Sequence, residues 1–305
     1  MRIIYFGLPL GALHLHACGF SPSVVILGHR REPGTRRLKK QLGHSTLILY
    51  RPNLEASGVV QLLASGKPEV LVSFFFPNRI PTTILRLASQ GAFGAHPSLL
   101  PRWRGPDPYF WCILRGDEAT GVTLHKLAPK YDEGEIIQQR EIKIGTCENA
   151  GQLAHRLDTI ALEMLVEELE RFAAGTPSSG APQDPDEATW APLPSEEMLT
   201  IQWNRSAKET LRLIRAAAPI PGAMAQFGTL HGEIISAQIA KGSPPRALVP
   251  AEAYVSDEGL VVTTGDRKGV LLQRIRIEER MLSGANLIKF GEELKGSGPD
   301  RGEKP

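Results

Sequence analysis

The chain has 305 residues, of which 42% are hydrophobic and 22% are charged, and its formal net charge at pH 7 is +2. This composition is typical of a soluble globular protein, and the length favours two domains over a single core. The longest apolar runs are far shorter than the roughly 20 residues of a membrane span, so no membrane partner is expected. Three scattered cysteines (Cys18, Cys112 and Cys147) predict no disulfide framework or metal site. A reducing cytoplasm is the expected location.

The first half of the chain alternates strand-like and helix-like segments. Unbroken apolar runs predict strands at 2–7, 23–28, 46–50, 69–76 and 91–96. Several of the segments between these runs carry apolar residues at helical spacing. Such alternation indicates a parallel sheet that is covered on both faces. We therefore predict an α/β domain over residues 1–175.

The second part of this domain is predicted to contain two helices and two strands. Asp107, Pro108 and Gly116 predict the cap, the first turn and the end of a short helix. Strand-like runs at 120–127 and 134–144 are joined by the turn APKYDEGE. A long amphipathic helix that stops at Gly175 then carries on one face Leu153, Leu157, Ile160, Met164 and Phe172.

The remainder of the chain has the pattern of a linker and a small second domain. Residues 176–202 are rich in Pro, Ser and Asp and lack an apolar period, which predicts a linker. Ser206 and Glu209 then form a capping box that opens a helix, and several short strands with turn signals follow. This pattern predicts a small β-barrel over residues 203–295, and residues 296–305 are expected to be disordered.

His96 is the first candidate for chemistry because it directly follows a strand-like run, where open α/β sheets bind ligands. Pro97 and Pro101 restrict the following loop and Gly105 permits a sharp turn, so a single imidazole pose suited to acid–base chemistry is expected. If the turn that carries Asp132 lies over the sheet edge, this carboxylate would orient His96 or accept a proton. The alternative is a histidine bonded to backbone and a solvated aspartate, and the spacing alone does not decide.

Other polar residues have weaker patterns. Ser98 lacks the G-x-S-x-G elbow of a serine hydrolase. His14, His16 and Cys18 lie close together without a further ligand cluster, so no metal site is predicted. His125 lies in a strand pattern and is interpreted as a packed or surface residue.

Three segments together resemble a known family: HPSLLPRWRG (96–105), TGVTLHKL (120–127) and YDEGEII (131–137). They are similar to the formyltransferases that use 10-formyltetrahydrofolate as donor, and the likeness covers nearly the whole chain. It is greatest to the members that act on methionyl-tRNA, and the sugar-nucleotide formyltransferases share the same core. The resemblance implies a Rossmann-type domain that binds the folate beside the S-L-L-P loop, followed by an OB-like barrel.

The resemblance also implies roles for individual residues. His96 and Asp132 would be two of three catalytic residues, and the donor site would be lined by Ser98, Leu99, Leu100 and Pro101. Formyl transfer to a primary amine needs a hydrogen-bond donor aimed at the formyl oxygen, where negative charge develops, and a group that takes the amine's proton.

The family's third catalytic residue is an asparagine, and Gly94 stands at its position. One lost oxyanion donor costs about 3 kcal/mol, or roughly a hundredfold in rate. A non-catalytic protein that binds folate or RNA is therefore the alternative to an enzyme. Asn78, in a segment that resembles another donor-site loop, is a candidate for a replacement amide.

The resemblance leaves the acceptor open. Initiator methionyl-tRNA is expected first, and a small amine such as an amino sugar or a modified amino acid second. The basic run at 28–44 corresponds to a longer loop that helps the tRNA enzymes hold the acceptor stem, although such a run can also be a solvated face. A monomer is expected.

Overall fold

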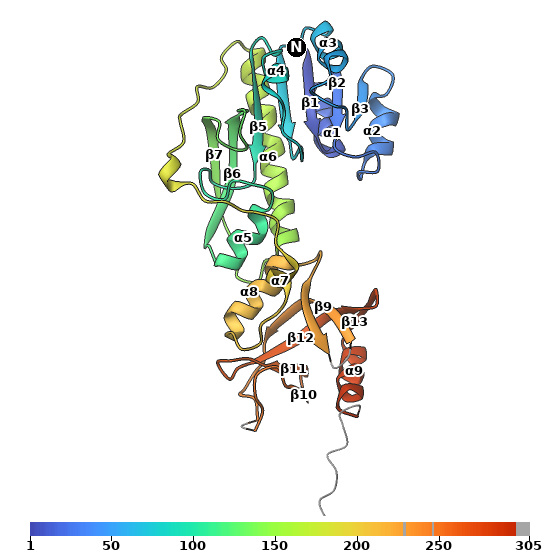
Figure 1. Cartoon of the computed structure of the whole chain (residues 1–305), viewed down its shortest axis with the longest axis vertical. Helices are drawn as coiled ribbons and strands as arrows, with labels where there is room; N and C mark the ends of the chain where they lie inside the picture. The colour runs from blue at the N-terminus through green and yellow to red at the C-terminus, as the bar shows by residue number, and fades with distance from the viewer. Residues whose placement is uncertain (228–229, 246, 297–305) are drawn as a thin grey trace, which may run out of the picture. The chain divides into compact units, whose positions relative to one another are not determined.

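The computed structural model describes residues 1–227, 230–245 and 247–296, which form two compact units (Figure 1). The first unit comprises Met1–Pro108, Ala119–Lys143 and Ala154–Pro192, and the second comprises Tyr109–Glu118, Ile144–Leu153 and the described residues from Leu193 onward. Of the tail that is expected to be disordered, only Gly296 is described, and it ends the last helix. The rest of that tail lies outside the described residues.

The first unit, which is described throughout, is built on a seven-stranded sheet with the order β3-β2-β1-β4-β5-β6-β7 (Figure 1). The strands are β1 Ile3–Gly7, β2 Val24–Leu27, β3 Leu47–Tyr50, β4 Val70–Phe74, β5 Gly91–His96, β6 Ala119–Lys126 and β7 Ile136–Lys143. The first five pair in parallel, which confirms the predicted parallel sheet. β6 runs antiparallel to both β5 and β7, so the sheet ends in an antiparallel edge.

The helices of the first half are α1 Pro9–Ala17, α2 Thr35–Leu42, α3 Ser57–Ser65, α4 Thr82–Leu85 and α5 Pro108–Arg115, and α6 is Ala150–Ala173. Gly116 directly follows α5 and Gly175 lies two residues after the end of α6, and their φ angles are 73° and 74°. Glycine adopts this left-handed conformation without the penalty of a Cβ, and it commonly ends helices for that reason. The predicted ends of α5 and α6 are confirmed.

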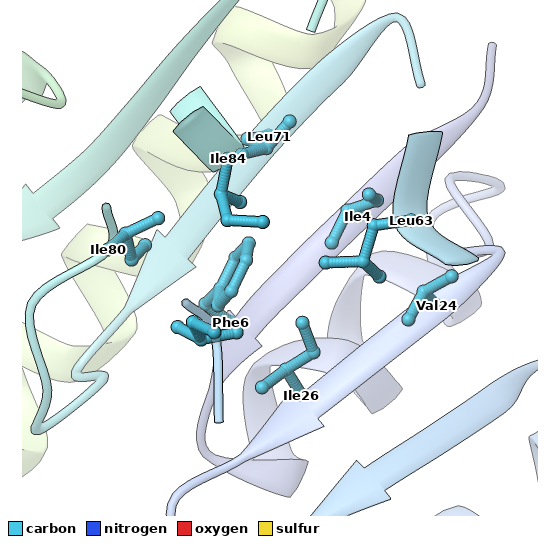
Figure 2. Close-up of a cluster of buried hydrophobic side chains, with 9 residues drawn as sticks. Ile4, Phe6, Val24, Ile26, Leu63, Leu71, Ile80 and Ile84 are labelled. Atoms are coloured by element: carbon cyan, nitrogen blue, oxygen red, sulfur yellow. The ribbon is translucent and has the colours of Figure 1, made fainter. Parts of the chain in front are cut away.

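Alternate residues of the strands pack on opposite faces of the sheet. On one face Phe6 of β1 and Leu71 of β4 pack in a buried cluster with Leu63 of α3 and Ile84 of α4 (Figure 2). On the other face the rings of Phe93 in β5 and Phe172 in α6 stack with centroids 5.4 Å apart. Burial on both faces explains why these strands are almost continuously apolar.

The second unit forms, over its described residues, a six-stranded antiparallel sheet with the order β10-β11-β12-β9-β8, and β13 pairs with β12. The short helix η1 Pro185–Glu187 lies at the end of the first unit. From Leu193 onward, the elements of the second unit are α7 Glu196–Leu199, α8 Ala207–Ala217, β8 Ala223–Phe227, β9 Leu230–Ile239, β10 Ala253–Ser256, β11 Gly259–Thr263, β12 Gly269–Ile277, β13 Arg280–Ser283 and α9 Ala285–Gly296. The capping box of α8 is confirmed, since Ser206 and Glu209 each accept a hydrogen bond from the other's backbone N–H. Helix α9 was not predicted.

Residues 176–192 of the expected linker lie with the first unit. Ala181 pairs with Ile136 of β7, and Trp190 pairs with Arg104. These contacts use backbone groups, which periodicity of apolar side chains does not reveal. Within the described part of the chain, no helix combines the length and the apolarity that crossing a membrane requires.

Gly94 lies in β5 where the neighbouring strand approaches closely. A Cβ at this position would lie 2.9 Å from the carbonyl oxygen of Ser73 in β4 and 3.1 Å from Cδ2 of Leu127. The carbonyl belongs to a paired strand and does not move independently of the sheet. The position therefore has no space for a larger side chain in this backbone.

We expect Gly94→Ala to lower the free energy of unfolding by about 1–3 kcal/mol, because overpacking forces the strands apart. Urea unfolding followed by circular dichroism measures the change. Gly58→Ala in α3 is the matched control, since nothing lies within 4 Å of a Cβ there and the change should be neutral or slightly stabilising. A Gly94→Ala variant as stable as the wild type would contradict the close approach.

Candidate active site

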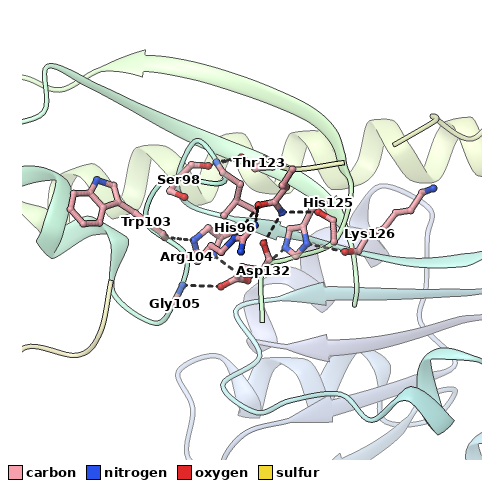
Figure 3. A network of polar contacts seen from close by, with 12 residues as sticks. His96, Ser98, Trp103, Arg104, Gly105, Thr123, His125, Lys126 and Asp132 are labelled. Carbon is pink, nitrogen blue, oxygen red and sulfur yellow. Dashed lines mark hydrogen bonds and ion pairs between the residues drawn. The ribbon is translucent and has the colours of Figure 1, made fainter. Parts of the chain in front are cut away.

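His96 ends β5 at the carboxyl edge of the sheet, as predicted, and its side chain is buried (Figure 3). Its Nε2 lies 2.8 Å from the carbonyl oxygen of Trp103. A carbonyl oxygen only accepts hydrogen bonds, so Nε2 carries the hydrogen and Nδ1 of the neutral ring carries a lone pair. The loop after β5 therefore fixes both the orientation and the tautomer of this imidazole.

Asp132 lies beside His96, although it comes from the turn between β6 and β7 (Figure 3). Its Oδ1 is 3.5 Å from Nδ1 of His96, within ion-pair distance, and its Oδ2 accepts a 2.9 Å hydrogen bond from the N–H of Gly105. The φ angle of Asp132 is 56°, a left-handed conformation that aspartate adopts more readily than most residues. The two residues that the sequence singled out are thus within reach of each other.

His125 is a third titratable side chain in this cluster. Its Nε2 is 3.8 Å from the same Oδ1 of Asp132, and its Nδ1 lies 3.0 Å from the carbonyl oxygen of Lys126. Burial lowers the pKa of this imidazole, and the carboxylate of Asp132 opposes that shift. His125 is packed, as expected, but it is also part of the polar centre. Finding it from sequence would have required the pairing register of β5 and β6.

The S-L-L-P residues divide into two pairs. Ser98 and Leu100 are buried; the Ser98 hydroxyl donates to a backbone carbonyl four residues on, and the Leu100 N–H donates to Oγ1 of Thr123. Leu99 and Pro101 are half-buried and present apolar surface. Ser98 and Leu100 therefore shape the loop from inside, and the other two side chains are accessible to a ligand.

Gln183 holds the turn that carries Asp132, although it lies in the segment predicted to be a linker and has no sequence signal of this role. Its Nε2 donates to the carbonyl oxygens of Asp132 and Gly134, each at 2.7 Å. Its Oε1 accepts from Nε and Nη2 of Arg104 at 3.1 and 2.7 Å, and Nη1 of Arg104 is 3.6 Å from Glu133. A glutamine in a run of Pro, Ser and Asp gives no local signal of such a role.

Two other expectations concern the surface. Asn78, the candidate for a replacement amide, is exposed on the loop after β4. The basic run borders a hollow of about 470 Å³ that is lined by His29, Arg30, Arg31, Tyr50 and Arg51. Arg30 and Lys39 both lie over the ring of Tyr50, at 5.5 and 5.2 Å from its centroid. The basic side chains thus line a concave surface at the carboxyl ends of β2 and β3.

Comparison with known proteins gives matches along most of the chain. The family model for formyl transferase matches residues 22–169, and the model for the formyl transferase C-terminal domain matches residues 195–290. The methionyl-tRNA formyltransferase of Thermotoga maritima is 30% identical over 281 residues, which cover 88% of this chain and 88% of that protein. That of Alkaliphilus metalliredigens is 30% identical over 318 residues, with coverage of 99% and 97%.

Solved structures of lower identity share the fold. HypX from Aquifex aeolicus, solved with tetrahydrofolic acid, superimposes with a TM-score of 0.67 at 20% identity; the match covers 97% of this chain and 48% of HypX, about half its length. The N-formyltransferase from Helicobacter canadensis, solved with folinic acid and dTDP-3-aminofucose, gives 0.66 at 14% identity, with coverage of 90% and 99%. Together with the sequence matches, these likenesses show that the chain belongs to the formyltransferase family and is similar along most of its length to methionyl-tRNA formyltransferases.

Proposed function

We propose that this protein transfers the formyl group of 10-formyltetrahydrofolate to a primary amine, and that the amino group of initiator methionyl-tRNA is its acceptor. The observation that carries the proposal is the convergence of His96 and Asp132 at the end of β5, in a chain of the formyltransferase family. The proposal keeps the monomeric state and the cytoplasmic location that the sequence predicts.

The reaction makes defined demands on the site. A bond forms between the amine nitrogen and the formyl carbon, and the bond from that carbon to N10 of the folate breaks. The amine gives up a proton, N10 gains one, and negative charge develops on the formyl oxygen in between. In the proposal, Oδ1 of Asp132 and Nδ1 of His96 take up the amine's proton. Nε2 bonds to the carbonyl oxygen of Trp103, so Nδ1 is the ring nitrogen that, once protonated, would donate a hydrogen bond to the developing charge.

The proposed donor site is the S-L-L-P loop. Leu99 and Pro101 offer half-buried apolar surface that suits the flat ring system of a folate. Ser98 and Leu100 support this surface from inside, through their bonds within the loop and to β6. All four residues therefore belong to the proposed donor site, two by contact and two by holding the loop.

Two observations support the proposed acceptor: a basic hollow on the surface and the sequence similarity to methionyl-tRNA formyltransferases. The basic hollow beside β2 and β3 suits the phosphates of a nucleic acid. The relatives that match most of the chain are methionyl-tRNA formyltransferases. A small amine is the second candidate, because a structural neighbour was solved with an amino sugar nucleotide, dTDP-3-aminofucose.

Tetrahydrofolate release from 10-formyltetrahydrofolate tests the proposal. We expect the wild type to release tetrahydrofolate with charged initiator tRNA and not without an acceptor. Asp132→Asn should lower the rate about 10²–10⁴-fold, the usual contribution of a general base. Asp257→Asn, at an exposed turn of the second unit, is the matched control and should keep the wild-type rate. Release with an amino sugar but not with tRNA would favour the second acceptor. Folate binding without release to any amine would favour the non-catalytic alternative.

The clamp on the Asp132 turn gives a separate prediction. Gln183→Ala removes the two hydrogen bonds that its Nε2 donates to the turn and the acceptor of Arg104, so the turn that carries the carboxylate loses this support. We expect kcat to decrease by about 10- to 100-fold, since small misplacements of a reacting group have effects of that order. Faster amide hydrogen exchange at residues 132–134 should accompany the decrease. The exposed Gln202→Ala is the control, and unchanged kcat in Gln183→Ala would show that the turn holds without the clamp.

A further inference from the structure

Gly94 and His125 are direct partners in the antiparallel β5–β6 ladder. Residues directly opposite each other project to the same face of the sheet, with Cβ atoms about 4.5–5.5 Å apart. Gly94 contributes no side chain to this face, and the close approach of Ser73 leaves no space for one. The face is occupied instead by the imidazole of His125, which points toward Asp132 (Figure 3).

Two backbone carbonyls fix the hydrogens of both imidazoles. Nε2 of His96 donates to Trp103, and Nδ1 of His125 donates to Lys126. When both rings are neutral, Nδ1 of His96 and Nε2 of His125 therefore carry lone pairs. Both of these nitrogens lie near one atom, Oδ1 of Asp132, at 3.5 and 3.8 Å.

In that neutral state, three acceptor atoms lie close together without a hydrogen between them. Such a contact inside a protein is electrostatically unfavourable, because low dielectric strengthens the repulsion between lone pairs and charge. It becomes favourable as soon as a proton or a hydrogen-bond donor enters the cluster. An amine that loses a proton as it reacts supplies both.

We propose that His125 is a positioning residue of the formyl-transfer site, which shares with His96, through Oδ1 of Asp132, the proton that the attacking amine gives up. This inference rests on the proposed function. The amine nitrogen bonds to the formyl carbon and its proton enters the cluster; the bond from that carbon to N10 then breaks and the proton passes to N10. The cluster returns to its starting charge, and no further reactant is needed.

The charges around His125 suit this role. The titratable and charged groups that act on it are Asp132, His96 and Arg104, and Arg104 is itself paired with Glu133 at 3.6 Å. Burial lowers the pKa of His125, which keeps its Nε2 free to accept near neutral pH. Asp132 raises this pKa and His96 lowers it, so the two neighbours have opposite effects. A proton in such a cluster has a pKa that belongs to the group as a whole.

Titration of His125 by NMR of the free protein tests the sharing without requiring turnover. We expect Asp132→Asn to move the His125 midpoint to lower pH and His96→Gln to move it to higher pH, each by at least about half a pH unit. The exposed His155 is the internal control and should keep its midpoint in both variants. A His125 midpoint that responds to neither substitution would overturn the proposal.

Kinetics then separate proton sharing from packing. We expect His125→Leu, which keeps apolar volume but no ring nitrogen, to lower kcat at least about tenfold, with little change in the KM for the donor and a displaced pH profile. His125→Gln, which retains a polar group, should restore part of the rate, and His155→Gln should match the wild type. A folded His125→Leu variant with wild-type kcat and pH profile would overturn the role of His125.

The outcomes also separate this inference from the function on which it rests. If the wild type transfers formyl to an amine but His125 neither responds in the titration nor affects the rate, the proposed function stands and the inference fails. If the wild type transfers formyl to no amine, the proposed function fails, and the catalytic role of His125 fails with it, whatever the titration shows.

Discussion

One carboxylate oxygen organises the polar centre of this protein: Oδ1 of Asp132, on which two imidazole nitrogens converge. One nitrogen of each ring lies at hydrogen-bond distance from a backbone carbonyl, and the other nitrogen of each ring lies within 3.8 Å of this carboxylate oxygen. The carboxylate is held by the N–H of Gly105, and its turn is held by Gln183. Groups that are fixed before the reaction need no reorganisation during it, which is the main advantage that a protein site has over water.

The antiparallel edge of the sheet makes this convergence possible. Because β6 is antiparallel to β5, Thr123 pairs with His96 and, two residues later, His125 pairs with Gly94. The turn that follows returns Asp132 to the same face, next to both rings. A glycine at position 94 allows the close approach of β4, and the centre is completed from the neighbouring strand instead. In the proposed mechanism, an imidazole from β6 lies beside Gly94, where the family resemblance leads one to expect a carboxamide.

The sequence was sufficient for the parts that depend on local patterns. Continuous apolar runs predicted β1 to β5, the glycines predicted the ends of α5 and α6, and His96 was placed at a strand end. Contacts between residues far apart in the chain could not be predicted from the sequence. Period-two alternation places His125 on a face but does not reveal that Gly94 is opposite, and Gln183 acts through backbone carbonyls that no side-chain pattern encodes. Within the S-L-L-P motif, burial of Ser98 and Leu100 follows from bonds to β6 that only the fold creates.

In the proposed mechanism, the proton of the amine enters the cluster at Asp132 during formyl transfer. Single-turnover transfer from 10-formyltetrahydrofolate to charged initiator tRNA, compared in H₂O and D₂O, tests it most directly. We expect a slower rate in D₂O for the wild type and a loss of that difference in Asp132→Asn, whose remaining slow reaction no longer passes its proton through the cluster. Equal rates in both solvents for the wild type, or the same solvent effect in both proteins, would contradict it.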